Sequence, residues 1–287
     1  MAAAMATCPV CGSGLADQGR DWLLKCPACG FLRALQEPRF NDAGALARID
    51  VDLRREALKQ LRLGNFQTVL RELARIPRAG KRLLEVGSAQ GWFLQAAASA
   101  GYEVLGIEPD VMAAECTPAG LAVIHGLFPA ALPAGARFDI IVFNDVLEHI
   151  PDVDAVLDAC TKLLAPGGVL VVNAPNRLGV FYRLALLLDR LGLPASLERL
   201  WQVGFPSPHL YYFTPSDLVI LGRRHGLEEF ARSRLQTLGI RGLWSRIRYD
   251  RSVSLPRATA LWLGLAPLCL LLALLPPDIT LQIFKRR

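Results

Sequence analysis

Short apolar runs alternate with longer amphipathic stretches through the middle of the chain. From Lys81 onward the runs read RLLEV, EVLGIE, LAVIH, FDIIVF and GGVLVV. Apolar runs of this length, separated by helix-length segments, are typical of parallel strands covered by helices on both faces. The pattern predicts an α/β fold with a Rossmann-like, doubly wound and mostly parallel sheet over residues 81–287.

The segment before the first run has a helical rather than a strand period. From Asp42 to Ile76 it is polar, with apolar residues at helical spacing, including Leu58, Leu61, Val69, Leu70 and Leu73. We expect one or two helices here, within a linker over residues 36–80.

The last part of the chain contains eighteen uncharged residues, ATALWLGLAPLCLLLALL, from Ala258 to Leu275. As a helix this segment would be about 27 Å long, slightly shorter than a hydrocarbon core of about 30 Å. Pro267 lies at its centre, and the following DITLQIFKRR alternates like a last, antiparallel strand. We therefore expect 258–275 to be a helix that lies on a membrane or covers the site; a helix buried before the last strand is the alternative.

The 287 residues carry a net charge of +6, and the excess is local. Between Arg223 and Arg257 there are nine arginines and three acids, an excess of six. A basic segment directly before an apolar one indicates an anionic membrane surface or nucleic acid, although a solvated basic face gives the same pattern. Trp244, Tyr249 and Trp262, with a second amphipathic segment at 178–193, favour an interfacial position.

The N-terminal sequence MAAAMATCPVCG has neither the charged nor the apolar region of a secretory signal, so a cytoplasmic protein with reduced cysteines is expected. The whole chain has seven cysteines, and four of them lie in the two similar segments CPVCG and CPACG. Two Cys-x-x-Cys turns can direct four thiolates to one tetrahedral ion, which leaves no open position for catalysis. We predict a structural zinc ribbon over residues 1–35, with Cys8, Cys11, Cys26 and Cys29 as ligands.

The stretch LLEVGSAQGWF, from Leu83 to Phe93, joins the first predicted strand to a helix through a glycine-containing turn. Such a turn brings backbone amides and a helix N-terminus close to a ligand. The dinucleotide pattern GxGxxG fails, because Ala89 and Trp92 occupy the second and third glycine positions. A nucleotide-phosphate loop also fails, because no Gly-Lys-Ser/Thr follows.

The pattern Glu85-x-Gly87-x-Ala89-x-Gly91, together with the segments that follow it, resembles the class I S-adenosylmethionine-dependent methyltransferases. The supporting segments are YEVLGIEPD, FDIIVFNDVLEHIPD and LLAPGGVLVVNAPN, and the likeness covers Leu83 to Phe213. The resemblance implies the class I methyltransferase fold and S-adenosylmethionine as cofactor. It also implies that Glu108, at the end of the second strand, accepts hydrogen bonds from both ribose hydroxyls.

The same resemblance implies a set of cofactor-binding positions: Glu85, Gly87, Ser88, Ala89, Gly91, Glu108, Pro109, Asn144 and Asp145. An acid or amide that the family often carries near the adenine is replaced here by Gly126, Leu127 and Phe128. Adenine contacts are therefore expected from apolar packing and backbone amides.

His149 and His209 are the candidate catalytic residues. Methyl transfer is largely a matter of positioning, but a general base helps when the acceptor keeps its proton. His149 follows the fourth strand, where it either acts in catalysis or packs the next helix. His209, in SPHLYYFTPSDL, resembles the His-x-x-x-Phe-Thr segment of many small-molecule methyltransferases; the alternative is a buried turn before a helix that starts at Thr214-Pro215.

These features predict a methyltransferase for a small-molecule, sugar or lipid-linked acceptor, in peripheral contact with the inner face of the cytoplasmic membrane. A ribosomal-RNA base methyltransferase is one alternative, but the ribbon carries only Arg20 and Lys25 against Asp17 and Asp21. That neutrality argues against nucleic acid, since phosphate contacts supply most of such affinity. The other alternative is a non-catalytic binding or scaffold protein that retains the fold.

Overall fold

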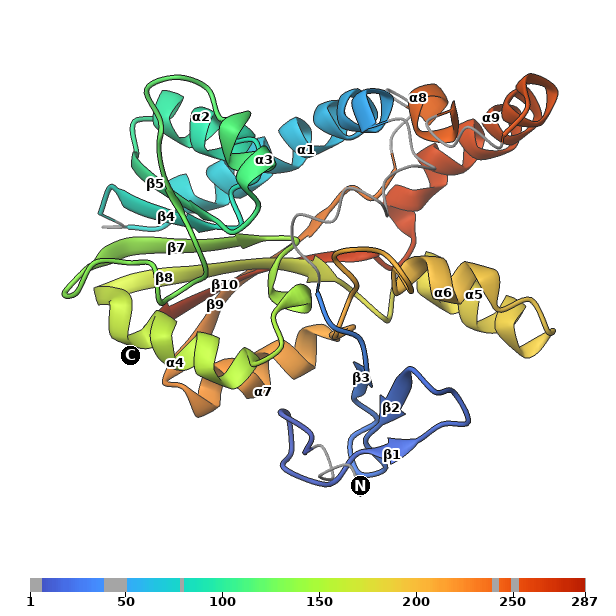
Figure 1. The fold of residues 1–287 in the computed structure, drawn as a ribbon, viewed down its shortest axis with the longest axis horizontal. Coiled ribbons are helices and arrows are strands. Elements are labelled where there is room, and N and C mark those ends of the chain that lie inside the picture. The colour runs from blue at the N-terminus through green and yellow to red at the C-terminus, as the bar shows by residue number, and fades with distance from the viewer. Residues whose placement is uncertain (1–6, 39–50, 78–79, 239–242, 249–252, 287) are drawn as a thin grey trace.

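The computed structural model describes residues 7–38, 51–77, 80–238, 243–248 and 253–286. A seven-stranded sheet with the order β6-β5-β4-β7-β8-β10-β9 forms its centre (Figure 1). The strands are β4 (Arg82–Val86), β5 (Glu103–Glu108), β6 (Ala122–His125), β7 (Phe138–Asn144), β8 (Leu164–Pro175), β9 (Leu227–Leu235) and β10 (Ile279–Arg286). The first five are parallel, and β10 lies antiparallel between β8 and β9.

Alternation along the strands distributes the apolar residues to two cores. Leu83 and Ile140 face a cluster with α1 (Val51–Ala74) and α2 (Trp92–Ser99), whereas Leu84 and Ile141 face a cluster with α4 (Val153–Leu163) and α7 (Pro215–Arg224). Adjacent residues of a strand point to opposite faces, so an unbroken apolar run fills both layers. The predicted doubly wound α/β sheet is therefore confirmed.

The strand after the apolar segment is also confirmed. Residues 279–286 of this segment form β10, which pairs antiparallel with β8 in a register that sets Ile279 opposite Pro175. Because β10 has a neighbouring strand on each side, Leu281, Ile283 and Phe284 are all buried. The predicted helix start at Thr214-Pro215 is present too: Thr214 and Asp217 form a capping box at the N-terminus of α7.

Helix α1 covers residues 51–74 of the segment predicted to be helical, and residues 42–50 of that segment lie outside the described residues. Its buried side chains Phe66, Val69 and Leu73 pack on the sheet, and the Phe66 ring meets that of Phe93 in α2 at a centroid distance of 5.2 Å. The helix is thereby fixed directly over the sheet (Figure 1).

The N-terminal segment forms a small antiparallel sheet of β1 (Ala16–Asp17), β2 (Leu23–Lys25) and β3 (Leu32–Ala34). Its third strand continues onto the main domain, where the Ala34 amide donates to the Leu210 carbonyl over 2.8 Å. The fully buried Phe31 packs against the rings of Tyr211 and Phe213. The ribbon therefore contacts the segment that directly follows His209.

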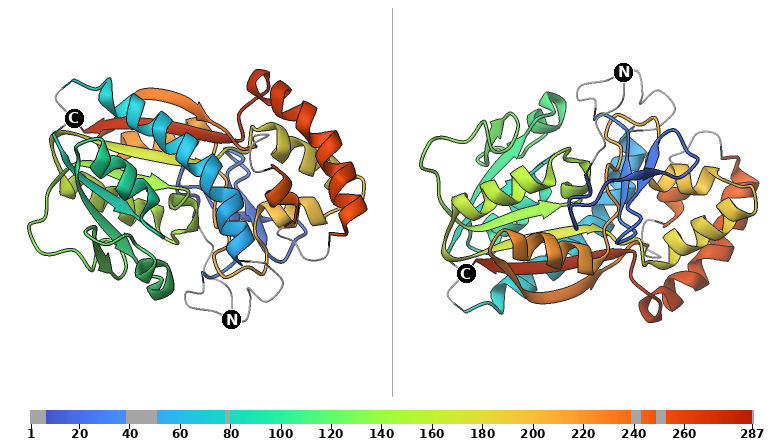
Figure 2. Two further views of the ribbon diagram at one scale, coloured as in Figure 1. Left: turned by 90° about the horizontal axis from the view of Figure 1, so that it is seen from above. Right: turned by 90° about the horizontal axis from the view of Figure 1, so that it is seen from below.

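Helices project from one end of the sheet (Figure 2). They are α5 (Val180–Arg190), α6 (Ala195–Leu200), α8 (Leu243–Arg248) and α9 (Leu255–Leu271), and the short turn η3 (Leu272–Leu274) follows α9. Two further short helices lie elsewhere: α3 (Val111–Glu115) follows β5, and η2 (Leu147–His149) follows β7. The predicted apolar helix at 258–275 forms α9 and η3. It buries Ala258 but leaves Leu263 62% and Leu274 82% exposed. Among the described residues, no helix combines the length and the apolar character needed to cross a bilayer.

Candidate active site

Two positions of the turn after β4 have a backbone conformation that favours glycine. Gly87 and Gly91 have φ angles of 71° and 70°, in the left-handed region. A Cβ built on Gly87 would lie 2.6 Å from Val146 Cγ2, so the β4 turn and the β7 turn approach too closely for a side chain. Gly91 then serves as the N-cap of α2. The loop is narrow because two turns at the carboxyl ends of neighbouring strands meet there.

Glu108 supports this loop from the end of β5. Its Oε2 accepts a hydrogen bond from the Ala89 amide over 2.7 Å, and its Oε1 accepts one from the Asp110 amide over 2.9 Å. Burial raises the pKa of Glu108, and these two amide donors oppose the shift. Within the loop, the buried Ser88 hydroxyl has no hydrogen-bond partner. The Glu108 carboxylate and the unpaired Ser88 hydroxyl are therefore both associated with this loop.

A chain of amides connects the ends of three strands. Asn173 donates to Asn144 Oδ1 over 2.7 Å, and Asn144 donates to Glu85 Oε1 over 2.8 Å. Asn173 Oδ1 also accepts from the Asp145 amide over 2.9 Å, which holds Asp145 at a φ of 54°. Burial raises the pKa of Glu85 to about 8, while the Asn144 donor acts in the opposite direction. The predicted residues Glu85, Asn144 and Asp145 therefore belong to one connected unit.

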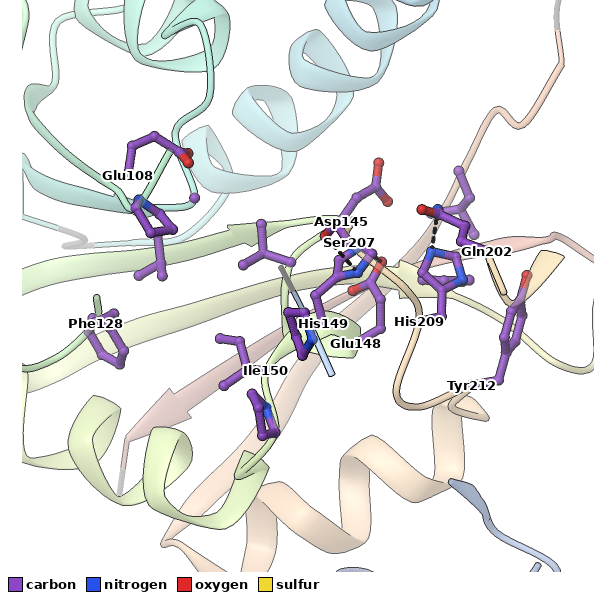
Figure 3. A pocket seen from close by; sticks show the side chains of 18 of the residues that line it. Glu108, Phe128, Asp145, Glu148, His149, Ile150, Gln202, Ser207, His209 and Tyr212 are labelled. Atoms are coloured by element: carbon purple, nitrogen blue, oxygen red, sulfur yellow. Dashed lines mark hydrogen bonds and ion pairs between the residues drawn. The ribbon is translucent and has the colours of Figure 1, made fainter. Parts of the chain in front are cut away.

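A cavity of about 750 Å³ extends along the carboxyl ends of these strands. Glu108, Pro109, Gly126, Leu127 and Phe128 line it near β5, and His149, Ser207, His209 and Tyr212 line it near α6 (Figure 3). A second hollow of about 30 Å³, lined by Glu85, Ser88, Ala89 and Asn144, shares Gly87 and Asp145 with the first. Of the predicted site residues outside the ribbon, only Gly91 lines neither hollow, and it supports the loop instead.

The two predicted histidines meet at the far part of the cavity. Their ring centroids are 4.8 Å apart, although they belong to different segments of the chain. The main-chain carbonyl of Glu148 accepts from the Leu210 amide over 2.8 Å and thereby joins the two segments. His149 Nδ1 lies 2.8 Å from the Pro208 carbonyl oxygen, and His209 Nε2 lies 2.9 Å from the Gln202 side-chain amide.

Burial keeps both imidazoles neutral. It lowers the pKa of His149 to about 4, and burial together with the neighbouring His149 lowers the pKa of His209 well below its usual value. Burial, reinforced by Asp145, raises the pKa of Glu148 well above its usual value. The far part of the cavity is therefore lined by polar side chains, Glu148, His149 and His209, whose neutral forms are favoured by burial.

Sequence reasoning missed several lining residues: Arg62, Phe181, Gln202, Tyr212, Asp278 and Glu148. Arg62 comes from α1, which was read as a linker, and its positive charge acts on Glu85, Asp145 and Glu148. Glu148 directly precedes His149, but in the sequence it resembles an ordinary acid at a helix start. Tyr212 could have been predicted from the sequence, because it lies three positions after His209 in the same motif. No sequence motif indicates that Arg62 or Asp278 lines the cavity.

The four predicted zinc ligands also lie together. The sulfur atoms of Cys8, Cys11, Cys26 and Cys29 are within 4.8 Å of one another. The Cys8–Cys29 and Cys11–Cys26 sulfur distances are 3.5 Å and 3.4 Å, close to the edge of about 3.8 Å expected for thiolates about 2.3 Å from a shared tetrahedral ion. The amides of Gly12 and Gly30 donate to the Cys8 and Cys26 carbonyls, which closes each turn. The geometry fits a four-thiolate metal site.

The strand order, the glycine turn and the acid at the end of β5 define the class I S-adenosylmethionine-dependent methyltransferase fold. A family model described as a methyltransferase domain matches residues 57–229. The chain therefore belongs to the methyltransferase-domain family, and the protein is an S-adenosylmethionine-dependent methyltransferase. The match begins within α1.

Curated relatives include ubiquinone biosynthesis O-methyltransferases. The protein of Cereibacter sphaeroides is 29% identical over 188 residues, which are 63% of this chain and 74% of the relative. That of Psychrobacter arcticus is 37% identical over 120 residues, covering 38% of this chain and 46% of the relative.

Solved structures agree at the level of the fold. Magnesium protoporphyrin IX methyltransferase from Synechocystis PCC 6803 with bound SAH has a TM-score of 0.53 at 14% identity, covering 85% of this chain and 91% of that one. An S-adenosylmethionine-dependent methyltransferase from Mesorhizobium loti has a TM-score of 0.51 at 16% identity, covering 76% of this chain and 96% of that one.

Proposed function

We propose that this methyltransferase methylates a hydroxyl group of a small, lipid-linked acceptor at a membrane surface. The observation that carries the proposal is one continuous cavity of about 750 Å³, which has Glu108 near one end and the two histidines near the other. One cavity of this kind can hold a cofactor and an acceptor side by side. The relatives named as ubiquinone biosynthesis O-methyltransferases support an oxygen atom as the acceptor.

The cofactor half of the site uses the residues around the glycine turn. In this proposal Glu108 accepts from the ribose hydroxyls, since a carboxylate offers two acceptor oxygens to two adjacent donors. Glu85, Asn144 and Asp145 surround the amino-acid end, and the unused Ser88 hydroxyl supplies a further polar contact. When bound, S-adenosylmethionine supplies a methyl group on a positively charged sulfur. Gly87, Ala89, Gly91 and Pro109 complete the proposed cofactor site.

The acceptor half is formed by His149, His209 and Tyr212. Both histidines are neutral, so each can accept a hydrogen bond from an acceptor hydroxyl and orient its oxygen toward the cofactor half. Phe181 of α5 and Ile279 of β10 add apolar surface to this part of the cavity. The segment that follows His209 forms one wall of this part, and the N-terminal ribbon holds its backbone through the Ala34–Leu210 hydrogen bond. For the ribbon itself we propose one structural zinc ion, held by the four cysteines.

The membrane contact is proposed for the exposed leucines of α5 and α9. Leu184 and Leu187 of α5 are 49% and 53% exposed, and Leu261 and Leu263 of α9 are 39% and 62% exposed. Both helices adjoin the carboxyl edge of the sheet, because α5 follows β8 and η3 leads into β10, which pairs with the end of β8. Apolar surface at the acceptor end of the cavity is where a lipid-linked molecule would arrive.

The proposal is tested with purified, zinc-loaded protein and S-adenosylmethionine carrying a labelled methyl group. A prenylated catechol in mixed vesicles, the water-soluble catechol and total ribosomal RNA serve as parallel acceptors. Label in the prenylated compound, lost in His209→Ala and retained in His225→Gln, supports the proposal. Label in RNA alone would replace it by the nucleic-acid alternative. Protein that neither binds the cofactor nor transfers label would be a non-catalytic binding protein.

A further inference from the structure

Three side chains at the acceptor end of the cavity converge on one point. Glu148, His149 and His209 each offer a ligand atom within 4.8 Å of the other two (Figure 3). Glu148 has a relative exposure of 0%, and neither of its carboxylate oxygens has a hydrogen-bond partner. His209 Nδ1 is also buried without a partner.

An arrangement of this kind is expensive without a further partner. A buried carboxylate costs several kcal/mol unless it is paired or protonated, and a buried ring nitrogen without a partner adds to that cost. The Glu148–His149 approach, 4.0 Å between Oε1 and Nε2, is too long to be a hydrogen bond. A bound cation that accepts electron pairs from Glu148, His149 and His209 together would remove this cost.

The hydrogen bonds around the two rings decide which nitrogen of each ring carries the proton and which is bare. The Pro208 carbonyl can only accept, so His149 Nδ1 carries the proton and donates over 2.8 Å. His149 Nε2 is then the bare nitrogen, and it is the atom nearest Glu148. The side-chain nitrogen of Gln202 lies 2.9 Å from His209 Nε2. Once this amide is turned so that its oxygen accepts from His209 Nε2, the Nδ1 of His209 is bare in the same way. Second contacts of this type orient the histidine ligands of metal ions.

We propose that Glu148, His149 and His209 bind a divalent first-row transition-metal ion. Two imidazole nitrogens and one carboxylate oxygen suit ions such as Co²⁺, Zn²⁺ or Fe²⁺ better than Mg²⁺ or Ca²⁺, which prefer oxygen ligands. Ligands about 2.1 Å from one ion lie roughly 3 to 3.5 Å apart, so binding would draw the three side chains together. The main-chain bond from Leu210 to Glu148 already holds the two segments in place for this movement.

Three protein ligands leave open positions on the ion, and these positions face the cavity that also contains Glu108. An acceptor with two neighbouring oxygen atoms could occupy two of them. With both ring nitrogens bound to it, the ion would replace the histidine hydrogen bonds: it would fix the orientation of that acceptor and favour loss of the hydroxyl proton. This part of the inference rests on the proposed function, and it assigns a chelating diol or catechol as the acceptor class.

The test uses the full, zinc-loaded chain and a titration with Co²⁺ followed by visible absorption. Cobalt at this site is expected to give d–d bands for one ion per chain, without the sulfur-to-cobalt charge-transfer band that cysteine ligation produces. Glu148→Gln and His209→Gln should each weaken Co²⁺ binding at least about 10-fold. His225→Gln is the matched control, because His225 also pairs with a carboxylate, Asp154 at 2.9 Å, outside the cavity.

Circular dichroism and S-adenosylmethionine calorimetry on the same samples separate the outcomes. Folded wild-type protein without the cobalt bands, or equal binding by Glu148→Gln, would overturn the metal site. Cobalt binding that is lost in Glu148→Gln but kept in His225→Gln would support it, even where the cofactor does not bind. Failure of cofactor binding alone would overturn the proposed function and leave the metal site standing.

Discussion

The Ala89 amide donates to Glu108 Oε2 over 2.7 Å, so the glycine turn after β4 and the end of β5 are joined by one carboxylate. Glu108 thereby has two functions in our proposal: it shapes the turn and it faces the cofactor. A residue of this kind should be more sensitive to substitution than its exposure alone suggests.

Glu108→Ala is expected to weaken S-adenosylmethionine binding about 10- to 100-fold, because charge-assisted hydrogen bonds contribute roughly 1.5–3 kcal/mol. Isothermal calorimetry with NAD as the comparison ligand measures the change. Glu103→Ala, at the exposed start of the same strand, is the control and should bind like the wild type. Equal affinities of the Glu108 and Glu103 variants would remove Glu108 from the site.

Gly87→Ala should damage the turn for two separable reasons. Both Gly87 and Gly101 have positive φ angles, 71° and 88°, but only a Cβ on Gly87 meets another residue, 2.6 Å from Val146 Cγ2. Gly101→Ala therefore carries only the backbone cost of about 1–2 kcal/mol. Thermal unfolding should show a larger loss for Gly87→Ala, and adding Val146→Ala should restore part of it. Equal losses for the two alanine variants would mean that the turns do not touch.

Glu85 predicts a particular pH dependence of stability. Its folded pKa is raised by burial from 4.5 to about 8, so the folded chain keeps a proton that the unfolded chain releases first. The stability that this group contributes is complete below about pH 4.5 and is lost as the pH rises through 8. Urea unfolding of wild type and Glu85→Gln at several pH values should therefore give a difference that favours the variant increasingly at high pH. A constant difference would contradict the buried, protonated Glu85.

The sheet could be predicted because its information is local. Each apolar run formed a strand, and Thr214 with Pro215 fixed a helix start. Glu85, Glu108 and Asn144 were found because the residues that end parallel strands necessarily meet at one edge. The predicted order of strands and helices was therefore enough to place these three residues together.

The acceptor end depended on contacts that no local pattern records. His149 and Pro208 are 59 positions apart, and the burial of Glu148 follows from that packing. Arg62 reaches the cavity because Phe66 fixes α1 over the sheet. A polar helix before the first strand gave no sign of this contact.

Removal of zinc should loosen the acceptor wall and leave the cofactor turn unchanged. The ribbon contacts the wall through Phe31, whose ring lies 5.8 Å from that of Tyr211, and through the Ala34–Leu210 hydrogen bond. After chelation, amides at 209–213 should exchange hydrogen faster, while those of β4 and β5 keep their rates. Phe31→Ala with zinc retained should give the same local effect. Unchanged exchange at 209–213 after zinc removal would disconnect the ribbon from the site.

The membrane contact predicts that charge on the exposed leucines reduces vesicle binding. Leu187→Glu with Leu263→Glu places two carboxylates on α5 and α9, where each opposes insertion into an anionic bilayer. Co-sedimentation with vesicles of mixed neutral and anionic lipid should fall at least about 10-fold, with cofactor affinity unchanged. Ile220→Glu is the matched control, because Ile220 is 44% exposed on α7, against the sheet face away from α1. Equal loss with the control would indicate a general charge effect, and no loss with the double variant would leave the leucines without a membrane function.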